Sequence, residues 1–386
     1  MLQDRFSHLG VNWFDGMSIN KDHFVAQENH MKEMCIDVIG QNLDPFNYGI
    51  LPSERGEPYS IHTDIDNRNI LNVKIRNLRA VTLGGARIEI TPATCKVVEM
   101  TRNLSELKLE KNRDRTFALI LTMNPFSRKP FGDADPEETP PRKPNVLPEY
   151  TLDLIPYDEL GGGEIGLFHI NLGLLVFIDG NFSVATDYIP PCTSIASSPM
   201  LLGYYEQMQA SLIKLEGNVT KIVQKVRGKQ QENKLAQSIS GISENILTYL
   251  SHQLPAISLY LQHKAPIYFI EKIIVLSKIT HNSIETWQGS GKEELLNYLT
   301  DWCDLNQGKL DKTLAELAVL KYQHHNAAIA FKKADNFLEI VSPLFKTLAD
   351  LDYIGKKIDT NLFVTEEVSV SESEEKKPLL KGWFSK

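Results

Sequence analysis

The chain has 386 residues, of which 42% are hydrophobic and 23% are charged, and its formal net charge is -8 at pH 7. This composition is ordinary for a soluble globular protein, and the length favours two folding units. The acidic balance argues against a nucleic-acid binder, because a protein that neutralises phosphates needs a basic surface.

The cysteines and the apolar segments indicate a cytoplasmic protein. The four cysteines show no CxxC pair, which is typical of free thiols in a reducing compartment: Cys35, Cys95, Cys192 and Cys303. The opening residues lack the charged and apolar regions of a signal peptide. The most apolar windows, 165–178 and 266–279, are shorter than the ~20 residues that span a bilayer. We therefore expect no direct membrane insertion.

The chain from about residue 45 to 185 has the pattern of β-strands. Residues 69–83 and 85–92 alternate apolar and polar side chains around a turn at Gly84 and Gly85. A second turn, at Asp179–Asn181, should close a hairpin within the strand-like stretch 164–185. We predict an antiparallel β-sandwich, and we assign residues 1–190 to a β-rich domain.

Residues 124–150 interrupt the strand pattern. They contain seven prolines, which exclude a central strand and the interior of a helix. We expect an extended, solvated excursion between two strands of the β-rich domain.

A helical pattern begins after residue 198. Apolar residues alternate at spacings of four and three over more than three heptads, the pattern that keeps one seam of a helix facing a partner. The seam consists of Leu201, Tyr205, Met208, Leu212, Leu215, Val219, Ile222 and Val226. Burying these eight side chains cannot offset the conformational entropy of the ordered residues, so the helix requires neighbours.

Further helices are predicted to follow and to form an up-down bundle over residues 200–352. They are expected at 243–262, 266–285, 292–306 and 310–351. Residues 353–386 are rich in serine and charge, which predicts a flexible acidic tail. The chain ends in a short aromatic and basic peptide that is either a docking peptide or a frayed terminus. Its docking candidates are Leu379, Leu380, Trp383 and Phe384.

No catalytic or cofactor motif is recognisable. The sequence GSGKEE at 289–294 lacks the spacing of a P-loop and follows a helix rather than a strand. His324 and His325 are adjacent, so on a helix they point in different directions and cannot share a metal ion, and no other histidine or cysteine is found at ligand spacing. We therefore expect a protein that is not an enzyme and that has no metal or cofactor.

A proline-rich stretch at 191–199 and the residues before it connect the two parts of the chain. The residues assigned to the domain joint, which overlap the start of this stretch, are Tyr188, Ile189, Pro190, Pro191 and Cys192. Cys192 is either a nucleophile or a small buried thiol at a packed joint, and the prolines favour the joint because each of them fixes its backbone. Ser197 and Ser198 offer N-caps for the following helix, with Pro199 in its first turn.

Two motifs carry a resemblance to a known family. The stretch DYIPPCTSIASSPMLL at 187–202 resembles the F-I-P-P-C-L-x-I-x-A-S-x-x-L segment of the type VI secretion baseplate subunit TssK. The stretch NWFDGMSINKDHFVAQE at 12–28 is similar to the family's opening W-x-E-G-M-x-L-x-P-x-H-F-Q-x-Q, although Asp15 replaces its glutamate and Lys21 lies near its Pro-Gln. Matching positions are Trp13, Gly16, Met17, His23, Phe24 and Gln27. The resemblance covers about residues 11–350.

The resemblance implies a homotrimer in which shoulder domains, like those of phage receptor-binding proteins, contact the wedge subunits TssF and TssG and helical necks form a shaft. It leaves only some 35 residues after the neck, where the family usually carries a C-terminal head that binds the membrane complex. Membrane-side subunits would then be reached through the distal neck or the tail. The wedge-contact candidates, for which burial within the shoulder is the alternative, are Trp13, Phe14, Gly16, Met17, His23 and Phe24.

Two other functions remain open at this point. A receptor-binding or fibre-adaptor protein of a phage tail would also place a β-domain on a helical stalk. Genes for sheath and membrane subunits beside this one would favour a baseplate, whereas capsid and lysin genes would favour a phage. An enzyme would require an apolar cleft with converging titratable groups.

Overall fold

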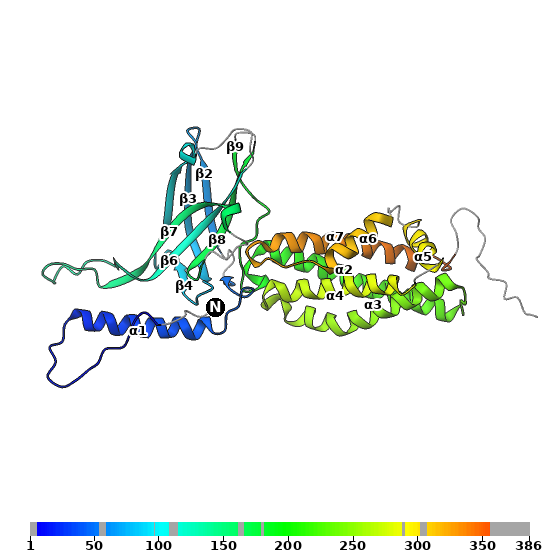
Figure 1. Ribbon diagram of the computed structural model, residues 1–386, viewed down its shortest axis with the longest axis horizontal. Helices are drawn as coiled ribbons and strands as arrows, with labels where there is room; N and C mark the ends of the chain where they lie inside the picture. The colour runs from blue at the N-terminus through cyan, green and yellow to red at the C-terminus, as the bar shows by residue number, and fades with distance from the viewer. Residues whose placement is uncertain are drawn as a thin grey trace, which may run out of the picture.

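A computed structural model describes residues 6–53, 59–95, 97–107, 115–160, 166–178, 181–287, 290–301 and 307–355. Two antiparallel sheets lie at one end of an elongated molecule, and a group of helices extends away from them along its long axis (Figure 1). The described part of the chain is therefore a mixed α+β fold, as the sequence predicts.

The first sheet is built around β3 (Ile70–Val81), whose side chains alternate between buried and more exposed positions. Strand β2 (Tyr59–Ile65) pairs with residues 71–78 of β3, and β5 (Val98–Asn103) pairs with residues 70–75. The C-terminal end of β3 pairs with β1 (Gly49–Ile50) and β4 (Arg87–Ile90), and the predicted glycine turn joins β3 to β4. The period-two pattern thus identifies a strand with one face in the core.

The second sheet has the order β7-β6-β8-β9, with β6 (Arg115–Phe131), β7 (Asn145–Pro156), β8 (His169–Ile178) and β9 (Asn181–Val184). The predicted hairpin between β8 and β9 is confirmed, because the last residue of β8 pairs with the first residue of β9. Apolar residues from both sheets share one hydrophobic core, so the two sheets stabilise each other.

Residues 124–150 extend beyond the sheets, as expected, but part of the segment is paired as strands, which was not predicted. β6 continues to Phe131, and after an irregularity in register it pairs again with β7, from Lys129↔Leu147 to Phe131↔Asn145. The result is a two-stranded arm that projects beyond the sheets (Figure 1). Both strands of such an arm are edges, so a proline can point its missing N–H away from the partner strand without loss of a ladder hydrogen bond. Prolines therefore did not exclude strand structure here.

Helix α1 (Lys21–Gly40) was not predicted from the sequence. It lies alongside the projecting arm and the lower end of the sheets (Figure 1). Glu33, Ile36 and Gly40 are buried on one side, whereas large apolar side chains are exposed on the other. Because apolar residues fall on both sides, the sequence shows no single apolar stripe of helical period.

Six α-helices are found in the described residues of the second part of the chain. They are α2 (Pro199–Gly228), α3 (Lys234–Leu259), α4 (Pro266–Glu285), α5 (Ser290–Asp301), α6 (Gln307–Ala318) and α7 (Ala327–Asp350). The predicted cap is confirmed: the Ser198 hydroxyl accepts a hydrogen bond from the Leu201 N–H at 3.4 Å, and Pro199 occupies the first turn. Helix α3 was predicted to begin at residue 243, but it begins nine residues earlier, at Lys234.

The single helix predicted over 310–351 is wrong, because the chain turns between α6 and α7. A 3-10 turn at His324–Asn326 precedes α7. The turn allows α6 to fold back against α4 and α7. Packing thus overrides a helical pattern that would otherwise run through this segment.

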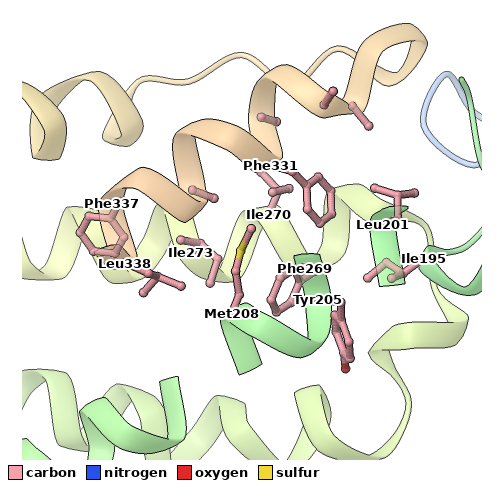
Figure 2. Packing of buried hydrophobic residues seen from close by; sticks show 14 of the residues in the cluster. Ile195, Leu201, Tyr205, Met208, Phe269, Ile270, Ile273, Phe331, Phe337 and Leu338 are labelled. Carbon is pink, nitrogen blue, oxygen red and sulfur yellow. The ribbon is translucent and has the colours of Figure 1, made fainter. Parts of the chain in front are cut away.

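The α2 seam is buried within this single chain. All eight seam residues are 3% exposed or less. Helices α3 and α7 flank α2, and aromatic contacts link it to α4: the ring centroids of Tyr205 and Phe269 are 4.8 Å apart (Figure 2). The seam needs neighbours, as predicted, but the chain's own helices supply them. The seam therefore gives no evidence for contact with other chains.

Candidate interface and interdomain joint

The joint at Tyr188–Cys192 is a buried segment between the sheets and α2. All five of its residues are buried. The Ile50 N–H donates to the Pro191 carbonyl at 2.8 Å, and the Thr193 N–H donates back to the Ile50 carbonyl at 2.9 Å. β1 therefore pairs with the joint on one side and with β3 on the other, which links the joint to the first sheet.

Gly49 makes this pairing possible. Its φ is +116°, and a Cβ atom added at this position would lie 2.1 Å from the Pro191 carbonyl oxygen. Only glycine combines this backbone conformation with such a close approach of two backbone segments. The sequence gives no signal for this role, because the partner segment is more than 140 residues away.

The joint is also held by the segment between α6 and α7. The buried Tyr188 hydroxyl donates to the His325 carbonyl at 2.6 Å. Asp187 forms an ion pair with Lys332 on α7. On the other side, the Ile195 N–H donates to the Lys264 carbonyl just before α4, at 3.1 Å. The joint therefore contacts both the sheets and the helices along its length.

His324 connects the same regions from a buried position, 4% exposed. Its Nε2 lies 2.8 Å from the Tyr48 carbonyl, and its Nδ1 lies 3.1 Å from the Tyr322 hydroxyl. A carbonyl can only accept, so Nε2 carries the proton and Nδ1 accepts from Tyr322. Burial lowers the pKa of His324 to about 4, and the ring is thus neutral at physiological pH.

Cys192 is a buried thiol, 1% exposed, that donates to the Pro190 carbonyl at 3.3 Å. Burial raises the pKa of this thiol. The thiolate, which is the nucleophilic form, is therefore strongly disfavoured. These contacts support the structural interpretation of Cys192.

The N-terminal motif is largely on the surface. Trp13, Phe14 and Phe24 are 45%, 64% and 62% exposed. Gly16 is exposed and Met17 is partly exposed. The alternative of burial within the shoulder is therefore wrong for the three aromatic residues, and they are available for a partner.

Three residues of the motif have local structural roles: Gly16, Asn20 and His23. Asn20 caps α1: its side-chain oxygen accepts from the N–H groups of Asp22 and His23, and the His23 Nδ1 accepts from the Asn20 N–H at 3.2 Å. Gly16 has a φ of +83°, which suits the turn before the helix. His23 and Gly16 thus shape the segment that presents Trp13 and Phe14.

Glu33 holds the N-terminal segment, residues 6–13, against α1. Its carboxylate, 1% exposed, accepts from the backbone N–H groups of Ser7 and His8 at 2.7–3.1 Å. Burial alone would raise the pKa of Glu33, but these N–H donors and His8 lower it below the ordinary value. Farther along, the Gln27 side chain accepts from the Val11 N–H at 3.4 Å.

The projecting arm completes this outer layer of the molecule. His8 stacks on Phe126 with ring centroids 4.1 Å apart. Lys32 on α1 donates to the Pro125 carbonyl at 3.1 Å, and Arg128 pairs with Glu28 at 2.5 Å. The N-terminal segment, α1 and the arm thus contact one another side by side.

A cavity of about 530 Å³ lies between the two sheets. Its walls include Leu71, Leu119, Leu172 and Tyr188, and the start of α2 closes one side. The only titratable side chains that line it are those of tyrosines. This cavity therefore does not provide the converging acids and bases that the enzyme hypothesis required.

His281 contradicts the expectation that no further histidine lies at the spacing of a metal ligand. His281 and Glu285 are four residues apart on α4, and the His281 Nε2 lies 3.8 Å from both the Glu285 and the Asp311 carboxylates. Lys292 forms an ion pair with the same Glu285 carboxylate and lowers its pKa. The three ligand-type residues therefore belong to a surface network of ion pairs.

Two other expectations concern membrane insertion and the C-terminal tail. None of the helices in the described ranges is long and apolar enough to cross a membrane. The predicted tail peptide at 379–384 lies outside the described residues.

Comparisons with known proteins point to solved structures only. No protein-family model matches the sequence, and no curated protein matches it. A crystal structure of TssK is similar at 14% identity and a TM-score of 0.48, over 85% of this chain and 68% of that one. TssK in the TssK-TssF-TssG baseplate subcomplex of a type VI secretion system is similar at 13% identity and a TM-score of 0.47, over 86% and 99% of the two chains. TssK from EAEC, in complex with a nanobody, is similar at 14% identity and a TM-score of 0.43, over 83% and 99%. All three are TssK, the family that the sequence motifs resemble.

Proposed function

We propose that this chain is a non-enzymatic structural subunit of a type VI secretion baseplate, of the TssK kind. Residues 1–190 would form the shoulder that binds the wedge subunits TssF and TssG. Residues 191–199 would form the joint, and residues 200–352 the neck that extends toward the membrane side. The subunit would act in the cytoplasm, at the inner face of the membrane and through protein partners.

The observation that carries the proposal is the pair of sequence motifs at 12–28 and 187–202, each in a setting that suits its proposed role. The first motif has exposed aromatic side chains and includes the start of α1, which lies at the end of the molecule away from the helices α2–α7 (Figure 1). The second is buried and hydrogen-bonded to both parts of the chain. An adaptor requires a partner-binding surface and a firm internal connection, and these two motifs would provide them.

The exposed aromatic residues are the proposed wedge contact. Trp13 and Phe14 lie together before α1, and the Trp13 ring is 6.2 Å from the ring of Phe24. Aromatic side chains that bury a large area are the residues that dominate binding energy at protein interfaces. His23 and Gly16 would support this contact indirectly, by fixing the cap and the turn.

A homotrimer is part of the proposal. Three chains of 43.7 kDa would give a particle of about 131 kDa. The membrane-side subunits would be reached by the far end of the neck or by the tail peptide that contains Trp383 and Phe384.

The test is co-purification of the chain with TssF and TssG encoded beside it. Trp13→Ala combined with Phe14→Ala should abolish co-purification, because it removes the two proposed anchors while leaving the cap of α1 intact. Tyr260→Ala combined with Tyr268→Ala is the matched control, since both tyrosines are about half exposed but lie on the helical part. Retained wedge binding by the Trp13 and Phe14 variant would contradict the proposed contact.

A further inference from the structure

The cavity between the two sheets is open to the surface on one side. Buried apolar side chains form its floor, among them Leu71, Leu119 and Leu172. Val184 at the end of β9 and Met200 in the first turn of α2 also line it, and they are 38% and 37% exposed. We call this space the inter-sheet cavity. Its mouth therefore lies where the second sheet meets the helices.

The lining of the inter-sheet cavity favours an apolar ligand. None of the described residues that line it carries a charge, and more than half of them are aliphatic. An anionic ligand would lose its water here without gaining a charged partner. Protein interiors are close-packed, and pockets of about 300–1,000 Å³ are those that hold ligands. A cavity of about 530 Å³ is thus suited to a group as large as an aromatic side chain.

The C-terminal part of the sequence contains apolar residues that suit this cavity. Leu379, Leu380, Trp383 and Phe384 follow the charged, serine-rich residues 366–377. Aromatic side chains bury a large area and contribute much of the binding energy at protein interfaces. Lys381 lies between the two apolar pairs, and a long lysine side chain can keep its charge in water while its neighbours are buried.

The peptide can reach the cavity of its own chain. Helix α2 begins at the cavity, and its 30 residues extend about 45 Å away from it. The last described residue, Gly355, lies beside the far end of α2, because the Ile354 N–H donates to the Gln231 side chain at 3.2 Å. Trp383 is 28 residues farther along the chain. A flexible chain of that length has an r.m.s. span of about 30 Å and a maximum of about 90 Å, so it can cover the distance.

A tether of this length makes even moderate binding effective. For a span of about 45 Å it supplies an effective concentration of the peptide on the order of 1 mM. A peptide with an intrinsic dissociation constant of about 0.1 mM would then be bound in about nine chains of ten. The burial of a few apolar side chains is enough for an affinity of this size.

We propose that residues 379–384 bind in the inter-sheet cavity of the same chain, with the Trp383 side chain inside it. The bound peptide covers the exposed parts of Val184 and Met200, and it is withheld from other partners for as long as it stays bound. This inference goes beyond the baseplate role and does not rest on it.

Formation of an intramolecular disulfide tests the proposal in the full-length chain. Thr186→Cys places a thiol at the exposed rim of the cavity, and Ser385→Cys places one directly after the peptide. Cys35→Ser and Cys303→Ser remove competing thiols. Oxidised glutathione, added to the dilute protein, should join the two introduced cysteines within one chain, as measured by mass spectrometry after digestion.

The matched control combines Ser385→Cys with Glu232→Cys. Glu232 is exposed and adjacent to Gln231, so it lies close to the point where the tail begins. An undocked tail would meet Glu232 more often than the distant Thr186, because the effective concentration falls with the span. We expect the disulfide at Thr186 to form at least about fivefold faster than the one at Glu232.

Two results would overturn the proposal. A disulfide that forms equally fast or faster at Glu232 would mean that the tail does not dock in the cavity. A disulfide at Thr186 that links only different chains would mean that the peptide does not bind its own chain.

A variant that fills the cavity gives an independent readout. Gly173 lines the cavity, and a Cβ atom added there would meet no atom within 4 Å. Gly173→Phe should therefore occupy the space and slow the disulfide at Thr186 about tenfold, without changing the rate at Glu232. If Gly173→Phe fails to fold, Trp383→Ser with Phe384→Ser should slow the reaction equally, because it leaves the sheets unaltered. An unchanged rate at Thr186 in a folded variant would contradict the proposal.

The neutral apolar dye Nile red tests the same contact without introduced cysteines. A tail that occupies the cavity in about nine chains of ten weakens dye binding about tenfold. Trp383→Ser with Phe384→Ser should therefore lower the dissociation constant of the dye about tenfold. Glu374→Ser with Glu375→Ser changes the tail outside the peptide and should have no effect. Equal dye affinity in the wild type and the Trp383 variant would exclude the tail as the occupant.

The outcomes separate this inference from the proposed function. Disulfide formation and dye binding are measured on the purified chain alone, whereas the baseplate role is read from co-purification with TssF and TssG. A chain that binds TssF and TssG but shows no preference for Thr186 would lose only the tail contact. A chain with the preference but without wedge binding would lose only the baseplate role.

Discussion

Helices α2 and α1 carry apolar seams of the same spacing in opposite surroundings. The residues of the α2 seam are 3% exposed or less, whereas Met31, Met34 and Val38 on α1 are 48–60% exposed. Helices α3, α4 and α7, which follow α2 in the described chain, pack against it, but α1 is followed by strands that leave its outer side open (Figure 1). A heptad pattern therefore shows that a helix needs a neighbour, and the elements that follow it decide whether the neighbour lies in the same chain.

The largest expected effect separates these two seams directly. Leu215→Ala in α2 removes buried methyl groups and leaves a cavity, so the free energy of unfolding should fall by about 2–5 kcal/mol. Met31→Ala on α1, measured at a concentration where the chain is monomeric, should change it by less than about 0.5 kcal/mol. Urea titration followed by circular dichroism measures both values.

The comparison would be broken if the two substitutions had similar costs. Equal destabilisation would mean that Met31 is covered within one chain. A negligible effect of Leu215→Ala would mean that α2 is not packed against α3 and α7 in solution.

A pH experiment tests how the helical part is tied to the sheets. The pKa of His324 falls from 6.5 to about 4 on folding, because burial disfavours the charged ring. Between these values the unfolded chain binds more protons than the folded one, so the contribution is complete above pH 6.5 and is lost as the pH falls toward 4. The loss should amount to about 2–3 kcal/mol for this residue.

His324→Gln is the informative variant, since glutamine can still donate to the Tyr48 carbonyl but does not titrate. The free energy of unfolding of the variant should depend less steeply on pH between 4 and 6.5 than that of the wild type. If the free energy of unfolding depended on pH with the same slope in both proteins, His324 would not be buried as a neutral ring. The link between Tyr48 and the α6–α7 turn would then be open to water.

The sequence predicted the parts of the fold that depend on local patterns. The alternation in β3, the pairing of β8 with β9 and the Ser198 cap each follow from neighbouring residues, and each is confirmed. The extended course of the arm was predicted from its prolines, but the pairing of its two strands was not, because a two-stranded arm tolerates proline at its edges. Helix α1 was missed because its two apolar sides cancel the helical pattern.

The contacts of the joint could not be predicted, because they depend on pairs of residues far apart in the sequence. Gly49 meets Pro191, and His324 meets Tyr48 across 276 residues. The roles of Gly49 and His324 follow only from which backbone atoms lie nearby, and neighbouring residues in the sequence do not indicate them. The N-terminal motif is the opposite case. The sequence identified Trp13 and Phe14 as candidates, but only the structure shows that their side chains are exposed and not buried.

The smallest expected effect concerns the inner side of α1. Glu33→Gln keeps the size of the side chain but replaces a carboxylate that accepts from the Ser7 and His8 N–H groups. Hydrogen bonds to charged groups are stronger than those to neutral ones, so the amides of Ser7 and His8 should exchange with deuterium about tenfold faster. The global free energy of unfolding should change little, because residues 6–13 can open without the sheets.

Acid should have the same effect on the wild type, because the pKa of Glu33 is lower in the folded state. The contribution is present above the unfolded pKa of about 4.5 and is lost as the pH falls through the lower folded value. Amide exchange corrected for intrinsic rates should therefore converge in the two proteins at low pH. If Glu33→Gln instead unfolded the whole chain in one transition, the outer layer would be part of the core, and the contrast between α1 and α2 would disappear.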